Sequence, residues 1–132
     1  MSQSNVDIVK KAYAAFGQGN IPGVLETFSP DIEWHSPIGL YRLGGVHRGP
    51  EGVLNNFFSV LMELYDGLDV TPREYIEAGD RVFVLGNGRG KGRATGQEID
   101  LPYVHIHEVH DGKITRFEEF EDTAIINRAF GQ

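Results

Sequence analysis

The most constraining feature of this sequence is its last third, residues 103–122, in which side chains alternate with a period of two on both sides of an Asp-Gly pair. This pattern predicts two antiparallel strands joined by a tight turn. Histidines of the first strand and glutamates of the second are therefore expected on adjacent strands. An imidazole that faces a carboxyl group in an apolar pocket can move protons near neutral pH. The pattern indicates a candidate acid/base site.

The register of this hairpin decides which side chains meet. A two-residue Asp-Gly loop would place His105 opposite Glu118, whereas a three-residue loop that includes His110 would place His105 opposite Phe117. We favour the three-residue loop, with Gly112 as its left-handed residue. One face of the hairpin then carries all the side chains of interest, namely Tyr103, His105, His107, Phe117, Glu119 and Glu121.

The balance of charges limits the classes of partner. The chain has 12 Lys and Arg against 19 Asp and Glu, which gives a formal net charge of -7. Such a chain has no basic stripe that could neutralise phosphates, so we expect neither nucleic acid nor an anionic membrane as a partner. No apolar run has the length of a membrane span, and the polar start lacks the features of a secretory signal. A cytoplasmic location is therefore expected.

Length and cysteine content limit the architecture. A chain of 132 residues is expected to form a single domain over 1–132, because one core suffices at this size. The absence of cysteine excludes disulfides, thiolate metal sites and cysteine nucleophiles.

Hydrophobic periodicity predicts helices first and strands later. Helical patterns cover 5–16, behind a Ser4/Asn5 cap, then a shorter segment after Pro22 that is closed by Ser29-Pro30, and then 50–65. A loop is expected over 37–49, and a final helical turn from Asp122. Strand patterns cover 32–36, 68–76, 81–92, 97–109 and 113–121. This order predicts an α+β fold with helices on one face of a bent, mostly antiparallel sheet.

Two segments carry a family resemblance. The chain reads Glu-Trp-His-Ser-Pro-Ile-Gly over 33–39 and Gly-Lys-Ile-Thr-Arg-Phe-Glu-Glu-Phe-Glu-Asp-Thr over 112–123. With the order of elements, they resemble the nuclear transport factor 2-like superfamily and its SnoaL-like polyketide cyclase and ketosteroid isomerase-like branch. The resemblance implies a cone-shaped α+β barrel, in which a strongly curved sheet and three helices of the N-terminal half enclose an apolar pocket. It also implies a homodimer.

The resemblance implies roles for two residues. SnoaL-like cyclases present a histidine and an acidic residue from the last two strands, and His105 and Glu119 occupy those positions here. Glu119 is one methylene longer than the aspartate of that pattern. Glu119 would take a proton from carbon next to a carbonyl, and His105 would orient it or donate to the enolate oxygen. The structural alternatives are a solvated acidic edge for Glu119 and a hydrogen-bonded core histidine for His105.

Other relatives within the superfamily fit less well. Ketosteroid isomerases carry a catalytic aspartate where this chain has Ser36, so His35 is the substitute base, provided that it faces inward. Limonene epoxide hydrolase has an arginine and an aspartate near the positions of Gly86 and Gly88, so its reaction is not expected. The glycines at 86, 88, 90 and 92 share one strand face, which favours a bend of the sheet with added cavity volume.

The pocket is expected to bind a small hydrophobic molecule without a cofactor. His105 and His107 could ligate a metal together with Glu119 or His35, but such a site is not expected, because nothing else in the sequence has ligand spacing. His107 and His110 are expected at the rim or in solvent. Residues Val104, Ile106, Ile114 and Phe120 are expected on the opposite sheet face, as a dimer interface or a second packing layer. The predicted substrate-binding residues are Tyr13, Phe16, Trp34, Tyr41, Phe57, Leu61, Leu101, Tyr103, His107 and Phe117.

Three functions remain open at this stage. The first is an isomerase, cyclase or dehydratase that acts on a hydrophobic carbonyl compound by acid/base chemistry. The second is a non-catalytic ligand-binding protein of the same fold, and the third is an association module whose cavity is filled by its own aromatic side chains. Only the enzyme requires His105 and Glu119 within reach of one ligand.

Overall fold

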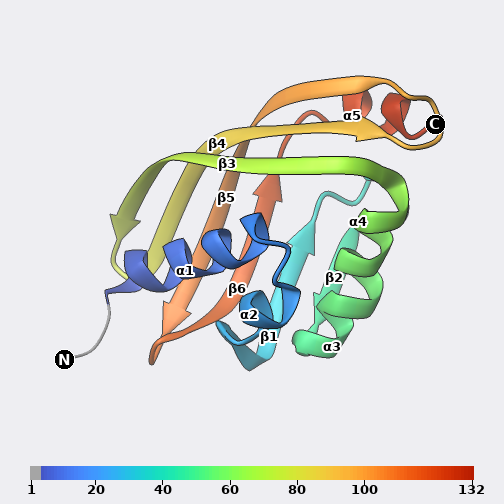
Figure 1. Cartoon of the computed structure of the whole chain (residues 1–132). Helices are drawn as coiled ribbons and strands as arrows, with labels where there is room; N and C mark the ends of the chain where they lie inside the picture. Colours follow the sequence, from blue (N-terminus) through green and yellow to red (C-terminus); the bar gives the residue numbers. More distant parts are fainter. Residues whose placement is uncertain (1–3) are drawn as a thin grey trace.

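In the computed structural model, which describes residues 4–132, six strands form one curved sheet with helices against one face (Figure 1). The strands lie in the order β2-β1-β6-β5-β4-β3, so the sheet is open, with β2 and β3 at its edges. All neighbours pair antiparallel except β1 and β6, which are parallel. The predicted α+β class is confirmed. The strands are β1 (Phe28–Ser36), β2 (Gly45–Arg48), β3 (Tyr65–Ala78), β4 (Arg81–Gly92), β5 (Glu98–His110) and β6 (Lys113–Phe120).

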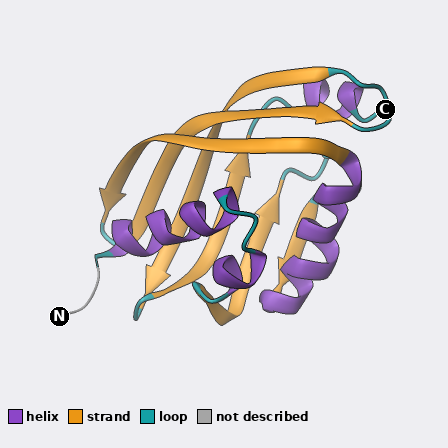
Figure 2. Ribbon diagram, in the orientation of Figure 1, coloured by secondary structure: helices purple, strands orange, loops and turns teal. Residues whose placement is uncertain are grey.

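The helices follow the predicted segments closely. Helix α1 (Asn5–Gly17) begins at Ser4, whose hydroxyl accepts a hydrogen bond from the backbone N–H of Asp7. The short α2 (Ile21–Leu25) follows, and Figure 2 shows α1 and α2 in front of the strands. The predicted 50–65 helix is one continuous helix with a π-helical turn in its middle. Its parts are α3 (Gly49–Val53), η1 (Leu54–Phe58) and α4 (Ser59–Leu64), and the chain ends with α5 (Thr123–Ala129).

Two boundaries differ from the prediction. Phe28 was predicted in the second helix, but α2 ends at Leu25 and Phe28 begins β1, opposite Ile114 of β6. The predicted loop over 37–49 contains β2, which pairs with β1. The side chains of β2 are only half-buried or exposed, so its sequence lacks the alternation of apolar and polar residues that predicts a strand.

The last hairpin has a different register from the one favoured. His110 lies opposite Lys113, so the loop is the two-residue pair Asp111-Gly112, and both of these residues have positive φ, 51° and 76°. The predicted three-residue loop is therefore wrong. An irregularity in the pairing between Glu108 and Val109 leaves one extra residue on β6 and shifts the register by one.

This bulge places the two predicted catalytic residues of the hairpin opposite each other. His105 lies opposite Glu119, and His107 lies opposite Phe117. The favoured register placed His105 opposite Phe117, two residues away on β6. A shift by two leaves every side chain on the same face, so the predicted inward face is correct although its pairs are not.

The same bulge overturns one outer-face expectation. Ile114 was predicted on the outer face, but its side chain is 0% exposed and packs in the core. It lies before the bulge, where the alternation of faces is reversed relative to the rest of β6. Phe120, after the bulge, is on the outer face and is 51% exposed.

Candidate active site

A cavity of about 130 Å³ lies between the helices and the inner face of the sheet. A cavity of comparable size in another protein is large enough to admit benzene. Its walls are mainly aromatic and aliphatic, and both phenylalanines of the π-helical turn, Phe57 and Phe58, face it. Of the residues predicted for the site, eleven line it: Tyr13, Phe16, Trp34, Phe57, Leu61, Leu101, Tyr103, His105, His107, Phe117 and Glu119.

A hydrogen-bonded group of α1 and β5 stands on the cavity wall. The hydroxyl of Tyr13 lies 2.6 Å from Nδ1 of His105 and 2.9 Å from Nε2 of His107. The two histidines are two residues apart on one strand, so their side chains share a face and both can reach the same phenol. The ring of Tyr103 stacks on that of His105 with centroids 3.9 Å apart. His105 is thus held from two sides.

The hydrogen bonds indicate which ring nitrogen of each histidine carries the proton. Tyr13 has one hydroxyl proton, so it donates to one imidazole and accepts from the other. Among the described residues, Nδ1 of His107 is buried and has no partner. If Tyr13 accepts from Nε2–H of His107 and donates to Nδ1 of His105, the unpartnered atom is a lone pair instead of an N–H, which is the less costly arrangement. His105 then carries its proton on Nε2.

Glu119 of β6 is buried beside this group. Its Oε2 lies 4.0 Å from Nε2 of His105, and its Oε1 accepts a hydrogen bond from the hydroxyl of Ser36 at 2.7 Å. The carboxyl group of Glu121, two residues further along the chain, also lines the cavity, and its charge helps to raise the pKa of Glu119. Two neighbouring carboxyl groups resist ionising together, because the first negative charge raises the pKa of the second.

Burial dominates the ionisation of the site. Burial, followed by the nearby charge of Glu121, raises the pKa of Glu119 well above its usual value, while the hydrogen bond from Ser36 opposes this. Burial also raises the pKa of Glu121. Burial lowers the pKa of His105 and brings that of His107 down to about 3, so both imidazoles are neutral at pH 7. The site therefore combines a carboxyl group whose pKa is raised with a neutral imidazole that can donate an N–H.

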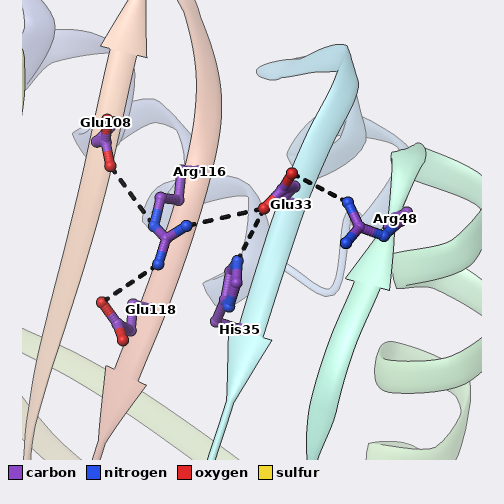
Figure 3. Close-up of polar contacts among 6 residues, drawn as sticks. All are labelled: Glu33, His35, Arg48, Glu108, Arg116 and Glu118. Atoms are coloured by element: carbon purple, nitrogen blue, oxygen red, sulfur yellow. Dashed lines mark hydrogen bonds and ion pairs between the residues drawn. The ribbon is translucent and has the colours of Figure 1, made fainter.

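Two predicted site residues lie outside the cavity. His35 is on the outer sheet face, where its Nε2 lies 3.0 Å from Oε1 of Glu33 (Figure 3). His35 was predicted to act as a substitute base only if its side chain faced inward, and it faces outward. Tyr41 is half-buried beside α5, where its backbone N–H donates to Asn127, and it does not line the cavity.

The outer face around His35 is charged. Arg116 lies 3.7 Å from Glu33, 3.5 Å from Glu108 and 3.9 Å from Glu118, and Arg48 lies 3.0 Å from Glu33 (Figure 3). All these side chains are partly exposed, so the pairs are structural and individually weak.

The predictions for the two remaining histidines, His107 and His110, have different outcomes. His107 was expected at the rim, but it is only 3% exposed and forms part of the cavity wall. His110 is exposed and lies 3.6 Å from Asp80. Within residues 4–132, no group of three or more histidines and acidic residues is gathered in a way that could hold a metal ion.

Sequence reasoning missed the role of Ser36. It was considered only as a substitution for a catalytic aspartate, whereas its hydroxyl donates to Glu119. The contact exists because β1 runs parallel to β6 with Trp34 opposite Phe117 and His35 opposite Glu118. No local pattern in the sequence predicts that pairing. Glu121 was assigned to the correct face, but not as a partner of Glu119.

The comparisons with known proteins agree with this geometry. Residues 9–117 match the family profile of the SnoaL-like domain, and the chain belongs to this family. The fold is that of the nuclear transport factor 2-like superfamily. An NTF2-like protein of unknown function from Burkholderia pseudomallei K96243 is 32% identical with a TM-score of 0.92, over 98% of this chain and 100% of that one.

Two further relatives are informative. TerC, whose crystal structure was obtained with polyporic acid, is 34% identical with a TM-score of 0.90, over 97% of this chain and 98% of its own. An uncharacterised protein of Mycobacterium tuberculosis (strain ATCC 25618 / H37Rv) is 27% identical over 117 residues, which is 89% of this chain and 88% of the relative. None of the helices formed by residues 4–132 has the length and hydrophobicity that a membrane span requires.

Proposed function

We propose that this protein is a cofactor-independent enzyme that transfers protons on a small hydrophobic carbonyl compound, as an isomerase, cyclase or dehydratase does. The observation that carries the proposal is a buried carboxyl pair, Glu119 and Glu121, beside the Nε2 atom of His105 on the wall of an apolar cavity. Carboxyl groups whose pKa is raised toward neutrality are suited to act as both acid and base at pH 7.

The reaction begins at carbon next to the carbonyl group. The ionised member of the carboxyl pair takes the α-proton, and the electrons of the broken C–H bond form an enolate. The N–H of His105 donates to the enolate oxygen and stabilises its charge in the apolar surroundings. Ser36 keeps one oxygen of Glu119 fixed, which leaves Oε2 toward the imidazole.

Three outcomes of this enolate are chemically open. Return of the proton to a different carbon of a conjugated enolate moves a double bond, which is an isomerisation. Attack of the enolate carbon on a second carbonyl group of the same molecule forms a ring, and the new alkoxide takes the proton. Loss of a β-hydroxyl group together with the proton releases water. All three use the same proton donor and acceptor.

A ligand-binding protein without catalysis is the second candidate. It is favoured by the distance of 4.0 Å between His105 Nε2 and Glu119 Oε2, which exceeds that of a hydrogen bond. In this interpretation the carboxyl pair and the imidazole only satisfy polar atoms of the ligand. TerC was obtained in crystals with polyporic acid, which supports small-molecule binding by a relative and makes this compound a first probe.

The decisive experiment compares turnover with binding. Wild type is assayed against a panel of cyclisable and isomerisable carbonyl compounds, next to Glu119→Gln and His105→Ala. We expect Glu119→Gln to lower kcat at least about 100-fold, because a general acid/base contributes 100- to 10,000-fold. Glu118→Gln, on the outer face of the same strand, is the matched control and should retain activity. If wild type turns over nothing while all variants bind ligand equally, the binding function replaces the enzymatic one.

We also propose that two copies of the chain associate through the outer sheet face. The resemblance to the superfamily implies a homodimer, and this face carries a row of apolar side chains next to the charged cluster around Arg116. The apolar residues are Phe83, Leu85, Val104, Ile106 and Phe120, of which Phe120 is 51% exposed. Apolar surface of this kind on a sheet is a typical association site.

A further inference from the structure

Four glycines of β4 share the inner face of the sheet, and three of them make room for neighbouring side or main chains. A Cβ atom at Gly86 would overlap the hydroxyl of Tyr103, and one at Gly92 would overlap the carbonyl oxygen of Ala129. At Gly90 a Cβ would lie 2.9 Å from the ring of Tyr65. At these three positions neighbouring atoms occupy the space of the missing side chain, so the predicted gain in cavity volume does not arise there.

Gly88 is different. An added Cβ there would meet no atom within 4 Å, and the residue lines the cavity. Its partners across the sheet are Val70 on β3 and Leu101 on β5, and both also line the cavity. The missing side chain at position 88 therefore leaves open space inside the pocket, where the other three glycines leave none.

The cavity is polar at one end and apolar at the other. His105 pairs with Val84, four residues before Gly88 on β4, and four residues of a strand span about 13 Å. Glu119, both histidines and Tyr13 lie near the His105 end. The walls around Gly88 are mainly aliphatic, and the ring of Tyr65 lies beside Gly90 at that end; the aliphatic residues are Leu68, Val70, Ile99, Leu101 and Ile126.

The hydroxyl of Tyr103 lies between the polar end and the apolar end of the cavity. Tyr103 pairs with Gly86, between the His105 row and the Gly88 row of the sheet, and its side chain is 6% exposed. Among the described residues its hydroxyl has no hydrogen-bond partner. A buried phenol without a partner is costly, and an oxygen of a bound ligand would satisfy it. Beyond this point the wall is mainly aliphatic, with the phenol ring of Tyr65 at its end.

The charges of the wall restrict the ligand further. No Lys or Arg is among the cavity-lining residues of the described chain, whereas Glu119 and Glu121 both line it. An anionic ligand would enter an apolar site next to a carboxylate without a compensating cation, which is unfavourable. An uncharged ligand avoids this cost.

We propose that Gly88 sets the length of the ligand, and that the ligand is an elongated, uncharged carbonyl compound with its oxygens at one end and an apolar chain at the other. The oxygen end lies at His105, Glu119 and Tyr103, and the chain occupies the recess beside Gly88. The placement of the oxygen end rests on the proposed function, whereas the recess at Gly88 does not.

The test is a binding series that does not depend on turnover. Trp34 is the only tryptophan of the chain and lines the cavity, so its fluorescence reports occupancy. Wild type, Gly88→Ala and Gly88→Leu are titrated with phenyl alkyl ketones from acetophenone to octanophenone. Gly52→Ala is the control, because Gly52 lies in α3, away from the cavity wall, and a Cβ there meets no atom within 4 Å. Thermal unfolding checks that each variant is folded.

The expected result is a change in chain-length dependence. In wild type each added methylene should tighten Kd about fourfold until the recess is full. In Gly88→Leu the short ketones should bind as in wild type, and the gain should stop at a chain about three to four carbons shorter, the size of a leucine side chain. Gly88→Ala should lie between these two, and Gly52→Ala should match wild type.

Three results would overturn the proposal. These are loss of affinity in Gly88→Leu that is equal for short and long ketones, an unchanged length limit, and no binding of any ketone to wild type. Alkylbenzenes of matched length test the oxygen end, because equal affinity for them would show that no polar group of the site contacts the ketone. If the length limit shifts as expected while wild type turns over no carbonyl compound, the proposed function fails and the role of Gly88 stands.

Discussion

The ionisation of single side chains in the cavity has a consequence for stability that can be measured without knowing the ligand. Burial raises the pKa of Glu119, so the folded protein keeps a proton there that the unfolded chain releases above the usual glutamate pKa of 4.5. The unfolded state is therefore favoured increasingly as pH rises from 4.5 to the folded-state pKa. Below pH 4.5 both states are protonated, and this cost is absent.

Glu119→Gln removes this dependence, because glutamine does not titrate. We expect the free energy of unfolding of Glu119→Gln, relative to wild type, to increase as pH rises from 4.5 to 7.5. The slope is at most about 1.4 kcal/mol per pH unit for one proton. Urea unfolding at several pH values measures it, with Glu118→Gln as the control. Parallel curves for wild type and Glu119→Gln would show that the carboxyl group ionises freely in the folded protein.

At the residue level, alternation predicted which side chains face inward but not what they contact. The inward set of β5 and β6 follows from the period of two, and the structure places it on the cavity wall. The partners of His105 and Glu119 come from α1 and β1, as Tyr13 and Ser36. These contacts join positions 92 and 83 residues apart, and only the packing of the whole chain defines them.

Among the elements, β4 shows how one strand combines packing with an open cavity. Its last glycine, Gly92, lies against the backbone of Ala129 in α5, and nearby the ring of Tyr65 packs at 5.0 Å against that of Phe130. A side chain at Gly92 would have to displace α5 from the end of the sheet.

Gly92 and Gly88 of this glycine row make a matched comparison. Gly92→Ala should lower the free energy of unfolding by about 1–3 kcal/mol, the usual cost of overpacking. Gly88→Ala, on the same face of the same strand, should leave stability unchanged or raise it by up to about 1 kcal/mol, because its Cβ meets nothing and the unfolded chain loses freedom. Urea unfolding of both variants measures the difference. An equal effect of the two substitutions would contradict the close packing of α5 on β4.

The hairpin of β5 and β6 shows the limit of sequence reasoning at this scale. The Asp111-Gly112 pair is a strong local signal for a turn, but the turn has two residues and not the three that were predicted. The bulge after Ile114 has no such signal, because the extra residue, Thr115, is an ordinary strand former. The shorter turn and the bulge together moved the predicted partner of His105 by two residues on β6, and they placed Ile114 in the core instead of on the surface.

For the molecule as a whole, the order of helices and strands was sufficient to predict the fold class, and together with the segments 33–39 and 112–123 it predicted the superfamily. Long amphipathic segments such as α1 and the central helix have clear periodicity, and β3 to β6 have clear turns. β2 was missed because edge strands are short and need not be apolar on either face. The pairing of β1 with β6 could not be predicted from the sequence either, although β1 supplies Ser36 to the site.

The outer face of the sheet determines the state of association that we expect. Sedimentation velocity should give the mass of two chains for wild type. Phe120→Glu places a charge in the centre of the proposed interface, where burial without a partner is unfavourable, and should give the mass of one chain. Met62→Glu is the matched control, because Met62 is also 51% exposed but lies on α4, away from this face. Dissociation by Met62→Glu but not by Phe120→Glu would place the interface on the helical side. Since the cavity lies on the inner face of the sheet and Phe120 on the outer face, Phe120→Glu should also retain ligand binding.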